Sequence, residues 1–137
     1  MTLTEIITWF ETLSPASAGE VARYYTDEAF FKDPFNEHTG IAQVKHVYEH
    51  MFKQVGNPRF KVHQRFLAAN GEAMLTWDFL FEMRGAAQVV RGTTHLKFAA
   101  DGRISHHRDY WDVAEELYEK IPLLGGLMRW IKRRAAE

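Results

Sequence analysis

Apolar residues recur with a helical period at the start of the chain. Ile6, Phe10 and Leu13 are four and three positions apart, which predicts an amphipathic helix. The segment Thr2–Glu5 before them is a capping box, in which the Thr hydroxyl and the Glu carboxylate accept hydrogen bonds from free amides at a helix start. Pro15 predicts that this helix ends before it, because proline lacks the amide that helical hydrogen bonding needs.

Further helices and a short strand are expected up to residue 55. A second capping box at Ser17–Glu20 predicts a short helix that ends near Asp27. The aromatic segment 29–35 predicts a strand, and Pro34 places it at a sheet edge or at a strand end because proline cannot donate to a central ladder. A third helix follows Gly40 and reaches about Val55, with an apolar stripe at Val44, Val47 and Met51.

From Pro58 onward the pattern changes to that of strands. Three turn signals, Asn70-Gly71, Arg84-Gly85 and Asp101-Gly102, divide this part into four runs that we expect to be consecutive antiparallel strands. In the second run, large apolar residues alternate with other side chains, which predicts one inward apolar face and leaves Asp78 on the outer face. The inward residues of that run are Leu75, Trp77, Phe79 and Phe81.

The order of elements predicts an α+β fold: a curved antiparallel sheet with helices on its concave face, forming a cone that encloses a pocket. We expect one domain over residues 1–137, in which residues 113–137 form a C-terminal helical extension interrupted at Pro122.

Composition narrows the class of protein. The 137 residues carry a net charge of −1, whereas nucleic-acid binders usually have a strong basic excess. The absence of cysteine excludes disulfides and thiol chemistry and fits a reducing compartment. The first ten residues lack the pattern of a signal peptide, and no apolar run approaches the roughly 20 residues that span a bilayer. We therefore expect a cytoplasmic protein that does not bind nucleic acid.

Two local motifs, residues 30–34 (Phe-Phe-Lys-Asp-Pro) and 103–112 (Arg-Ile-Ser-His-His-Arg-Asp-Tyr-Trp-Asp), together with the order of elements, resemble the nuclear transport factor 2-like superfamily. This superfamily includes ketosteroid isomerases, limonene epoxide hydrolases and SnoaL-like polyketide cyclases. The resemblance implies a cystatin-like cone with a pocket, chemistry without a cofactor, and a homodimer formed through the outer sheet face.

Asp33 matches the general base of the ketosteroid isomerases. Aromatic neighbours would desolvate its carboxylate; alternatively, Asp33 and Pro34 form an ordinary turn in which the carboxylate accepts backbone hydrogen bonds. The two isomerase hydrogen-bond donors correspond to Trp9 and Thr94, which can donate but do not reproduce an acidic pair. Steroid isomerase activity is therefore not expected.

Asp109 resembles the catalytic Asp of the epoxide hydrolases, although their Arg-x-Asp triplet is missing here. The alternative is an ion pair between Asp109 and Arg108 or another surface base. If Asp109 faces inward, the strand period places His107 and Trp111 beside it, and His107 is then either a proton relay or a hydrogen-bonded part of the pocket wall.

These arguments predict one site. Its catalytic residues are Asp33, Asp109 and His107, and its substrate-contacting residues are Trp9, Phe31, Phe35, Trp77, Phe79, Thr94 and Trp111. No metal is expected, because the pair His46 and His50 lacks a third ligand with suitable spacing.

The basic and apolar segment 121–134 leaves two alternatives open: a helix that packs over the pocket mouth or the sheet, or a peripheral contact with an anionic membrane. Three functions remain at this stage. The first is an enzyme that isomerises, cyclises or hydrates a small hydrophobic substrate through carboxylates. The second is a binding domain for an apolar metabolite or lipid, and the third is a protein-interaction module that uses the outer sheet face.

Overall fold

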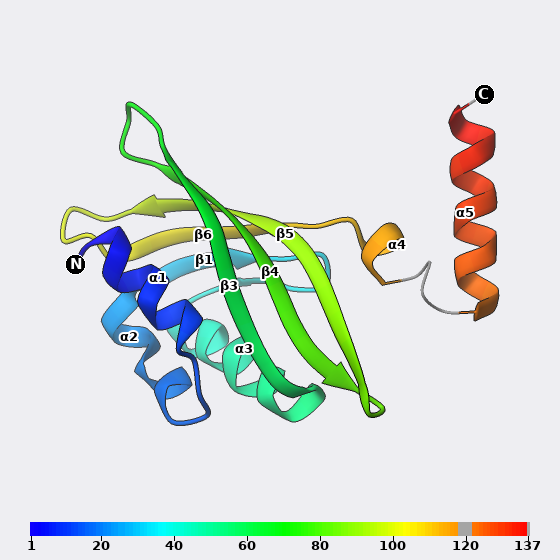
Figure 1. Ribbon diagram of the computed structural model, residues 1–137. Coiled ribbons are helices and arrows are strands. Elements are labelled where there is room, and N and C mark those ends of the chain that lie inside the picture. Colours follow the sequence, from blue (N-terminus) through cyan, green and yellow to red (C-terminus); the bar gives the residue numbers. More distant parts are fainter. Residues whose placement is uncertain (118–121, 137) are drawn as a thin grey trace.

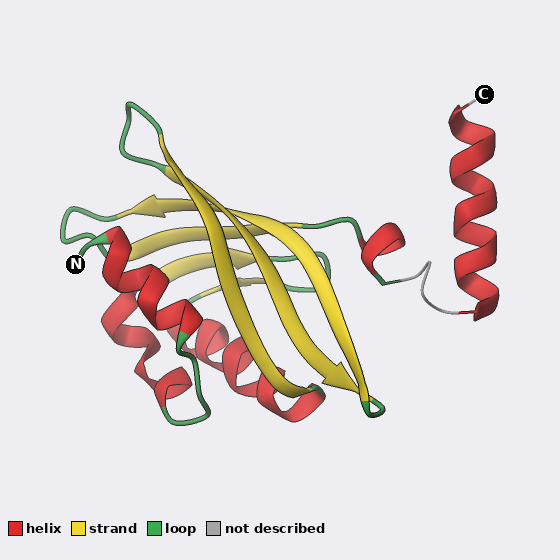
Figure 2. Ribbon diagram, in the orientation of Figure 1, coloured by secondary structure: helices red, strands yellow, loops and turns green. Residues whose placement is uncertain are grey.

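A computed structural model describes residues 1–117 and 122–136 and shows an α+β fold with a six-stranded, curved, unclosed sheet (Figure 1). Helices cover one face of this sheet (Figure 2). The elements are α1 (Leu3–Glu11), a 3-10 helix (Ser17–Glu20), α2 (Val21–Tyr24), β1 (Tyr25–Lys32), β2 (Glu37–Thr39), α3 (Ile41–Gln54), β3 (Gly56–Leu67), β4 (Ala73–Met83), β5 (Ala86–Phe98), β6 (Ile104–Tyr110), α4 (Val113–Glu116) and α5 (Pro122–Ala136).

The strands are ordered β2-β1-β6-β5-β4-β3, and the last four in sequence form the predicted antiparallel meander. One pair differs from the expectation, because β1 runs parallel to β6. Of the two placements expected for the aromatic segment, the sheet edge is wrong, because β2 pairs with the outer side of β1, and the strand end is confirmed. Pro34 follows the end of β1, which leaves the ladder intact.

The predicted turns join the long strands. Gly71 and Gly102 have φ angles of +87°, and Arg84 and Gly85 have φ angles of +52° and +77°, which is the left-handed geometry that tight hairpins require. In β3 the pairing register shifts between Val62 and Gln64, and such bulges bend a strand.

The first capping box is confirmed, and the second is wrong. Thr2 accepts a hydrogen bond from the amide of Glu5, whose carboxylate accepts one from the amide of Thr2. At Ser17, however, a 3-10 helix begins instead, without a side-chain cap, and the Ser17 hydroxyl accepts a hydrogen bond from the amide of Ser14. The helix that follows ends at Tyr24, earlier than predicted, because Tyr25 is already extended and pairs with Ile104 in the sheet.

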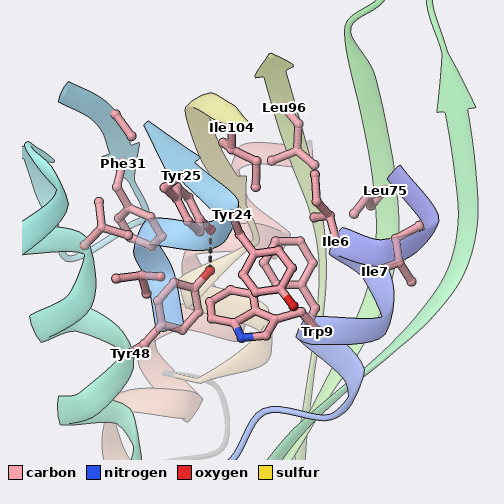
Figure 3. Close-up of a cluster of buried hydrophobic side chains, with 14 of the residues drawn as sticks. Ile6, Ile7, Trp9, Tyr24, Tyr25, Phe31, Tyr48, Leu75, Leu96 and Ile104 are labelled. Atoms are coloured by element: carbon pink, nitrogen blue, oxygen red, sulfur yellow. Dashed lines mark hydrogen bonds between the residues drawn. The ribbon is translucent and has the colours of Figure 1, made fainter. Parts of the chain in front are cut away.

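An aromatic cluster joins the helices to the sheet (Figure 3). The Trp9 ring stacks on Tyr24 with 4.6 Å between ring centroids and contacts Tyr48 edge-on at 5.2 Å. Its indole N–H donates to the carbonyl of Ser17 at 3.1 Å. Trp9 therefore links α1 to the 3-10 helix and belongs to the core.

The Trp77 ring lies over Gly92 on the neighbouring strand. A Cβ atom on Gly92 would overlap Cη2 of this ring and lie 2.6 Å from Cζ2. We predict that Gly92→Ala lowers the free energy of unfolding by about 1–3 kcal/mol, because the ring must move out of a packed position. Chemical denaturation measures the loss. Gly19→Ala is the control, since its Cβ would meet nothing within 4 Å, and equal losses in both variants would contradict the prediction.

The two C-terminal helices extend the domain. Glu116 of α4 is buried and accepts hydrogen bonds from the Arg91 backbone amide at 3.3 Å and from Nε of Arg91 at 2.6 Å, so α4 is fixed against β5.

The helix α5 lies beside α4 and away from the sheet (Figure 1). Residues 118–121, which include the start of the segment predicted from Ile121, lie outside the described residues. None of the helices in the described part of the chain is long and apolar enough to cross a bilayer.

Candidate active site

A cavity of about 750 Å³ lies between the concave face of the sheet and α3. Aromatic side chains from several strands form much of its wall, as is common for sites that bind small molecules. Nine of the ten predicted site residues line it: Phe31, Asp33, Phe35, Trp77, Phe79, Thr94, His107, Asp109 and Trp111. The structure therefore brings together both carboxylates and the histidine that the sequence predicted.

Asp109 is held by one residue of its own strand, β6, and one of the neighbouring strand, β5. One oxygen, Oδ1, lies 2.7 Å from Nε2 of His107 and accepts a hydrogen bond from the Thr94 hydroxyl at 2.5 Å. Trp77 in turn donates its indole N–H to the Thr94 oxygen at 2.7 Å. Within the described part of the chain, Oδ2 of Asp109 has no hydrogen-bond partner, and the side chain is 16% exposed. One carboxylate oxygen is thus fixed, and the other has no partner among the described residues, on a side chain that lines the cavity.

Two buried tyrosines extend this arrangement. The Tyr25 hydroxyl lies 2.8 Å from Nδ1 of His107 and 2.6 Å from the hydroxyl of Tyr48. Figure 3 shows these two hydroxyl groups pointing toward each other across the aromatic cluster. Six side chains therefore form one continuous chain of hydrogen bonds: Tyr48, Tyr25, His107, Asp109, Thr94 and Trp77. We call it the Asp109 network.

The direction of each hydrogen bond follows from the chemistry of its ends. An ionised carboxylate only accepts, so Nε2 of His107 carries a proton, and in a ring with a single proton Nδ1 is then an acceptor. The Tyr25 O–H then donates to Nδ1, and the Tyr48 O–H donates to the Tyr25 oxygen. On the other side of Asp109, the Trp77 indole N–H donates to the Thr94 oxygen, and the Thr94 O–H donates to Oδ1 of Asp109. Both arms therefore stabilise negative charge on Asp109.

The tyrosines keep their protons because the core surrounds them. Burial raises the pKa of Tyr25 well above its ordinary value, and the adjacent Tyr48 raises it further. Burial also raises the pKa of Tyr48, although the hydrogen bond with Tyr25 acts in the opposite direction. Neither phenol can therefore act as a base near neutral pH, and their role is to orient His107.

This protonation predicts a loss of stability in alkaline solution. Above about pH 10, Tyr25 and Tyr48 lose their protons in the unfolded chain but keep them in the folded protein. Each of the two tyrosines should therefore lower the free energy of unfolding by about 1.4 kcal/mol for every pH unit above 10. The contribution is fully present below pH 10. Chemical denaturation at several pH values measures how steeply the free energy of unfolding falls with pH. Tyr48→Phe should make this fall less steep, whereas Tyr110→Phe, at an exposed position, should leave it unchanged. An unchanged slope in Tyr48→Phe would contradict this assignment.

Asp33 forms a turn instead of presenting a free carboxylate. Its Oδ1 atom accepts hydrogen bonds from the amides of Phe35 and Asn36 at 2.8 and 2.7 Å. Its Oδ2 atom accepts one from the Asn36 side-chain amide at 3.1 Å. Asp33 borders the cavity, but these contacts match the alternative that the sequence left open, in which Asp and Pro form a turn.

Trp9 is the predicted contact residue that does not line the cavity, because its indole N–H is bonded to Ser17 in the core. Sequence reasoning missed Tyr25, which it placed at the end of a helix, and Tyr48. A signal for Tyr48 existed, since it lies four positions after Val44 on the buried stripe of α3. No such signal marks Tyr25, whose contact with His107 joins residues 82 positions apart.

The other candidate polar groups lie outside this network. His46 and His50 stack with 5.6 Å between ring centroids at exposed positions on α3, and the described residues contain no group of three or more His, Cys, Asp or Glu side chains placed to hold a metal ion. Asp78 faces the outer side of the sheet, as predicted, where it lies 3.0 Å from Nε2 of His63.

Known structures share this fold at low sequence identity. A hypothetical protein with a ketosteroid isomerase-like fold from Catenulispora acidiphila, in complex with trimethylamine, superposes with a TM-score of 0.70 at 14% identity, covering 85% of this chain and 92% of that chain. An NTF2-like protein of unknown function from Exiguobacterium sp. 255-15 gives a TM-score of 0.70 at 18% identity, with coverages of 82% and 98%. For a putative SnoaL-like polyketide cyclase from Jannaschia sp. CCS1 the values are 0.68 and 13%, with coverages of 82% and 86%.

A search of curated proteins found no match. The model of the SnoaL-like domain family, in contrast, matches residues 6–107, which is most of the chain. Together with the cone-shaped fold and its cavity, this match shows that the chain belongs to the SnoaL-like domain family of the NTF2-like superfamily.

Proposed function

We propose that this protein is an enzyme that binds a small hydrophobic molecule in its cavity and moves a proton with Asp109 as the general base. One observation carries the proposal: Asp109 lines an aromatic cavity, and its network fixes Oδ1 while no described residue forms a hydrogen bond with Oδ2. A general base must be held in place, must accept a proton and must be reachable by substrate. Asp109 meets all three requirements.

We propose two reactions that a positioned carboxylate can catalyse by moving a proton at carbon. In the first, Oδ2 would take a proton from the carbon between the carbonyl and the C=C bond of a β,γ-unsaturated ketone, the C–H electron pair would pass into the carbonyl as a dienolate, and Asp109 would return the proton to the γ-carbon, which is an isomerisation. In the second, the enolate carbon would attack another carbonyl of the same molecule, and Asp109 would return the proton to the alkoxide that forms, which is a cyclisation. His107 and Thr94 would hold the carboxylate in position throughout, because both donate to the other oxygen.

The structural neighbours support a small-molecule pocket. The Jannaschia neighbour is a putative polyketide cyclase, and the Catenulispora neighbour holds trimethylamine. Asp33, which the sequence proposed as a second acid or base, is less suited to that role because its carboxylate already accepts hydrogen bonds from Phe35 and Asn36.

Hydrogen exchange at carbon tests this proposal without knowledge of the natural substrate. The protein is incubated in D2O with a panel of apolar ketones and enones, and NMR follows deuterium uptake beside the carbonyl. We expect catalysed uptake in some members of the panel. Epoxides in water labelled with oxygen-18 form a parallel panel for hydration. Binding without exchange or hydration in any member would favour the second candidate, a binding domain for an apolar metabolite or lipid.

The exposed surface of α5 favours a membrane location for that second candidate. Residues 122–136 contain four basic side chains and no acidic ones. Three large apolar residues within about one helical turn are exposed, at 51% for Leu127, 53% for Trp130 and 45% for Ile131. An amphipathic basic helix of this kind fits an anionic membrane surface.

Vesicle sedimentation checks this membrane contact. We expect the protein to bind vesicles that contain phosphatidylglycerol more tightly than vesicles of phosphatidylcholine alone. The double variant Lys132→Gln/Arg133→Gln should weaken binding by roughly tenfold or more, since each base near an anionic surface contributes about 1 kcal/mol. The variant Lys45→Gln/Lys53→Gln removes the same charge from α3 and is the control. Equal binding by both variants would exclude α5 as the contact.

A further inference from the structure

We infer that the cavity selects cationic ligands, so that an ammonium ion with an apolar substituent binds more tightly than a neutral or anionic molecule of the same shape. This inference concerns the class of ligand. It rests on the ligand-binding part of the proposed function and not on the proton transfer.

Apart from histidines, the side chains around the cavity that carry charge are acidic. Asp33 and Asp109 line it, and the described lining residues include no lysine or arginine. The hydrogen bonds to Asp109 come from His107 and Thr94, and no lysine or arginine of the described residues forms an ion pair with this carboxylate. A cationic ligand can supply a counterion, whereas an anionic ligand meets two negative charges in a partly dry space.

The aromatic wall favours the same kind of ligand. Phe79 contacts Phe60 at 4.7 Å and Phe81 at 5.1 Å between ring centroids, both edge to face, and Trp77 contacts Phe60 at 5.5 Å with the planes at 90°. These rings line the cavity. The faces of aromatic rings carry partial negative charge and attract cations, including quaternary ammonium groups.

Two basic side chains lie beside the site but do not line the larger cavity. Lys32 and Arg108 line an adjoining hollow of about 410 Å³ that shares Asp33 and Asp109 with the cavity. Lys32 lies 3.8 Å from the carboxylate of Glu37, and the Arg108 guanidinium lies over the ring of Tyr110 at 4.6 Å. Both bases therefore have partners outside the larger cavity.

The titratable groups that face the cavity also include four histidines, at positions 38, 46, 50 and 107. A proton on any of these rings would add positive charge to the cavity wall, so the affinities are compared at one fixed pH of 7.5.

Three ligands of matched shape test the inference. Phenyltrimethylammonium, tert-butylbenzene and benzenesulfonate share a phenyl ring with a tetrahedral head group and differ in charge. Titration of the full chain, followed by NMR shifts of the tryptophan indole N–H groups, gives the three affinities. We expect the ammonium ion to bind roughly tenfold more tightly than tert-butylbenzene, with benzenesulfonate weakest.

A pair of variants assigns the selectivity to one residue. Asp109→Asn should remove most of the preference for the ammonium ion while tert-butylbenzene binds as before. Asp78→Asn removes the same charge from the outer face of the sheet and should leave the preference unchanged.

The outcomes separate the two claims. If tert-butylbenzene binds at the tryptophans as tightly as the ammonium ion, or benzenesulfonate binds most tightly, the charge inference is wrong and the pocket function stands. If none of the three binds, the cavity is not a ligand site, and both the inference and the proposed function fail. The comparison on the unmodified protein decides between these outcomes even if Asp109→Asn does not fold.

Discussion

Tyr25→Phe is expected to lower the free energy of unfolding by about 2–4 kcal/mol, a large loss for the removal of one oxygen atom. The Tyr25 hydroxyl is the link between Nδ1 of His107 and the hydroxyl of Tyr48. Its removal leaves a buried acceptor and a buried donor without partners, and each unsatisfied group costs about 1–3 kcal/mol. The Phe ring fills the same space, so packing changes little.

Tyr48→Phe is the matched control. It removes the same atom from the end of the network, where only the Tyr25 oxygen loses a donor and the Tyr25 O–H still reaches His107. We expect a loss of about 1 kcal/mol, as for a typical hydrogen bond. Urea denaturation of both variants gives the comparison. Equal losses, or a larger loss for Tyr48→Phe, would show that the hydroxyl of Tyr25 is not the central link.

The second large effect concerns the reaction. Once the exchange panel has yielded a substrate, Asp109→Asn should lower kcat/KM by about 10²–10⁴, the usual contribution of a general base. The Asn side chain has the shape of Asp, and its oxygen can still accept from His107 and Thr94. The loss would therefore come from the missing base and not from a changed cavity.

Asp33→Asn separates the two carboxylates that the sequence proposed. Because Asp33 holds a turn, its replacement should leave kcat/KM nearly unchanged and lower stability modestly. A rate loss at Asp33 as large as that at Asp109 would mean that the ligand engages Asp33, and the turn would then be part of the reaction site.

Most of the fold could be predicted from local sequence patterns. The capping box at Thr2–Glu5, the stripe on α3 and the three turn signals are short-range features, and all of them appear in the structure. The alternation along β4 also placed Trp77 inward and Asp78 outward, which a shift of one residue would have reversed. Strand period likewise placed His107 beside Asp109.

Contacts between distant segments were beyond this reasoning. The parallel pairing of β1 with β6 brings Tyr25 next to His107. The residues around Tyr25 in the sequence give no pattern that predicts this strand pairing. The turn at Asp33 could not be predicted for a different reason, which is that its local sequence fits two structures. Its residue types fit either a base or a capped turn, and only the positions of the neighbouring amides decide between them. The homodimer through the outer face stays a prediction.

The measurement that tests the account most directly is the protonation state of the His107 ring, read from long-range proton–nitrogen NMR spectra at pH 7. The Asp109 network predicts a neutral ring with the proton on Nε2, because that nitrogen donates to an ionised Asp109 and Nδ1 accepts from Tyr25. A ring without a proton on Nε2 would contradict the account. Asp109 would then have to hold the proton of that hydrogen bond, and it could not be the base.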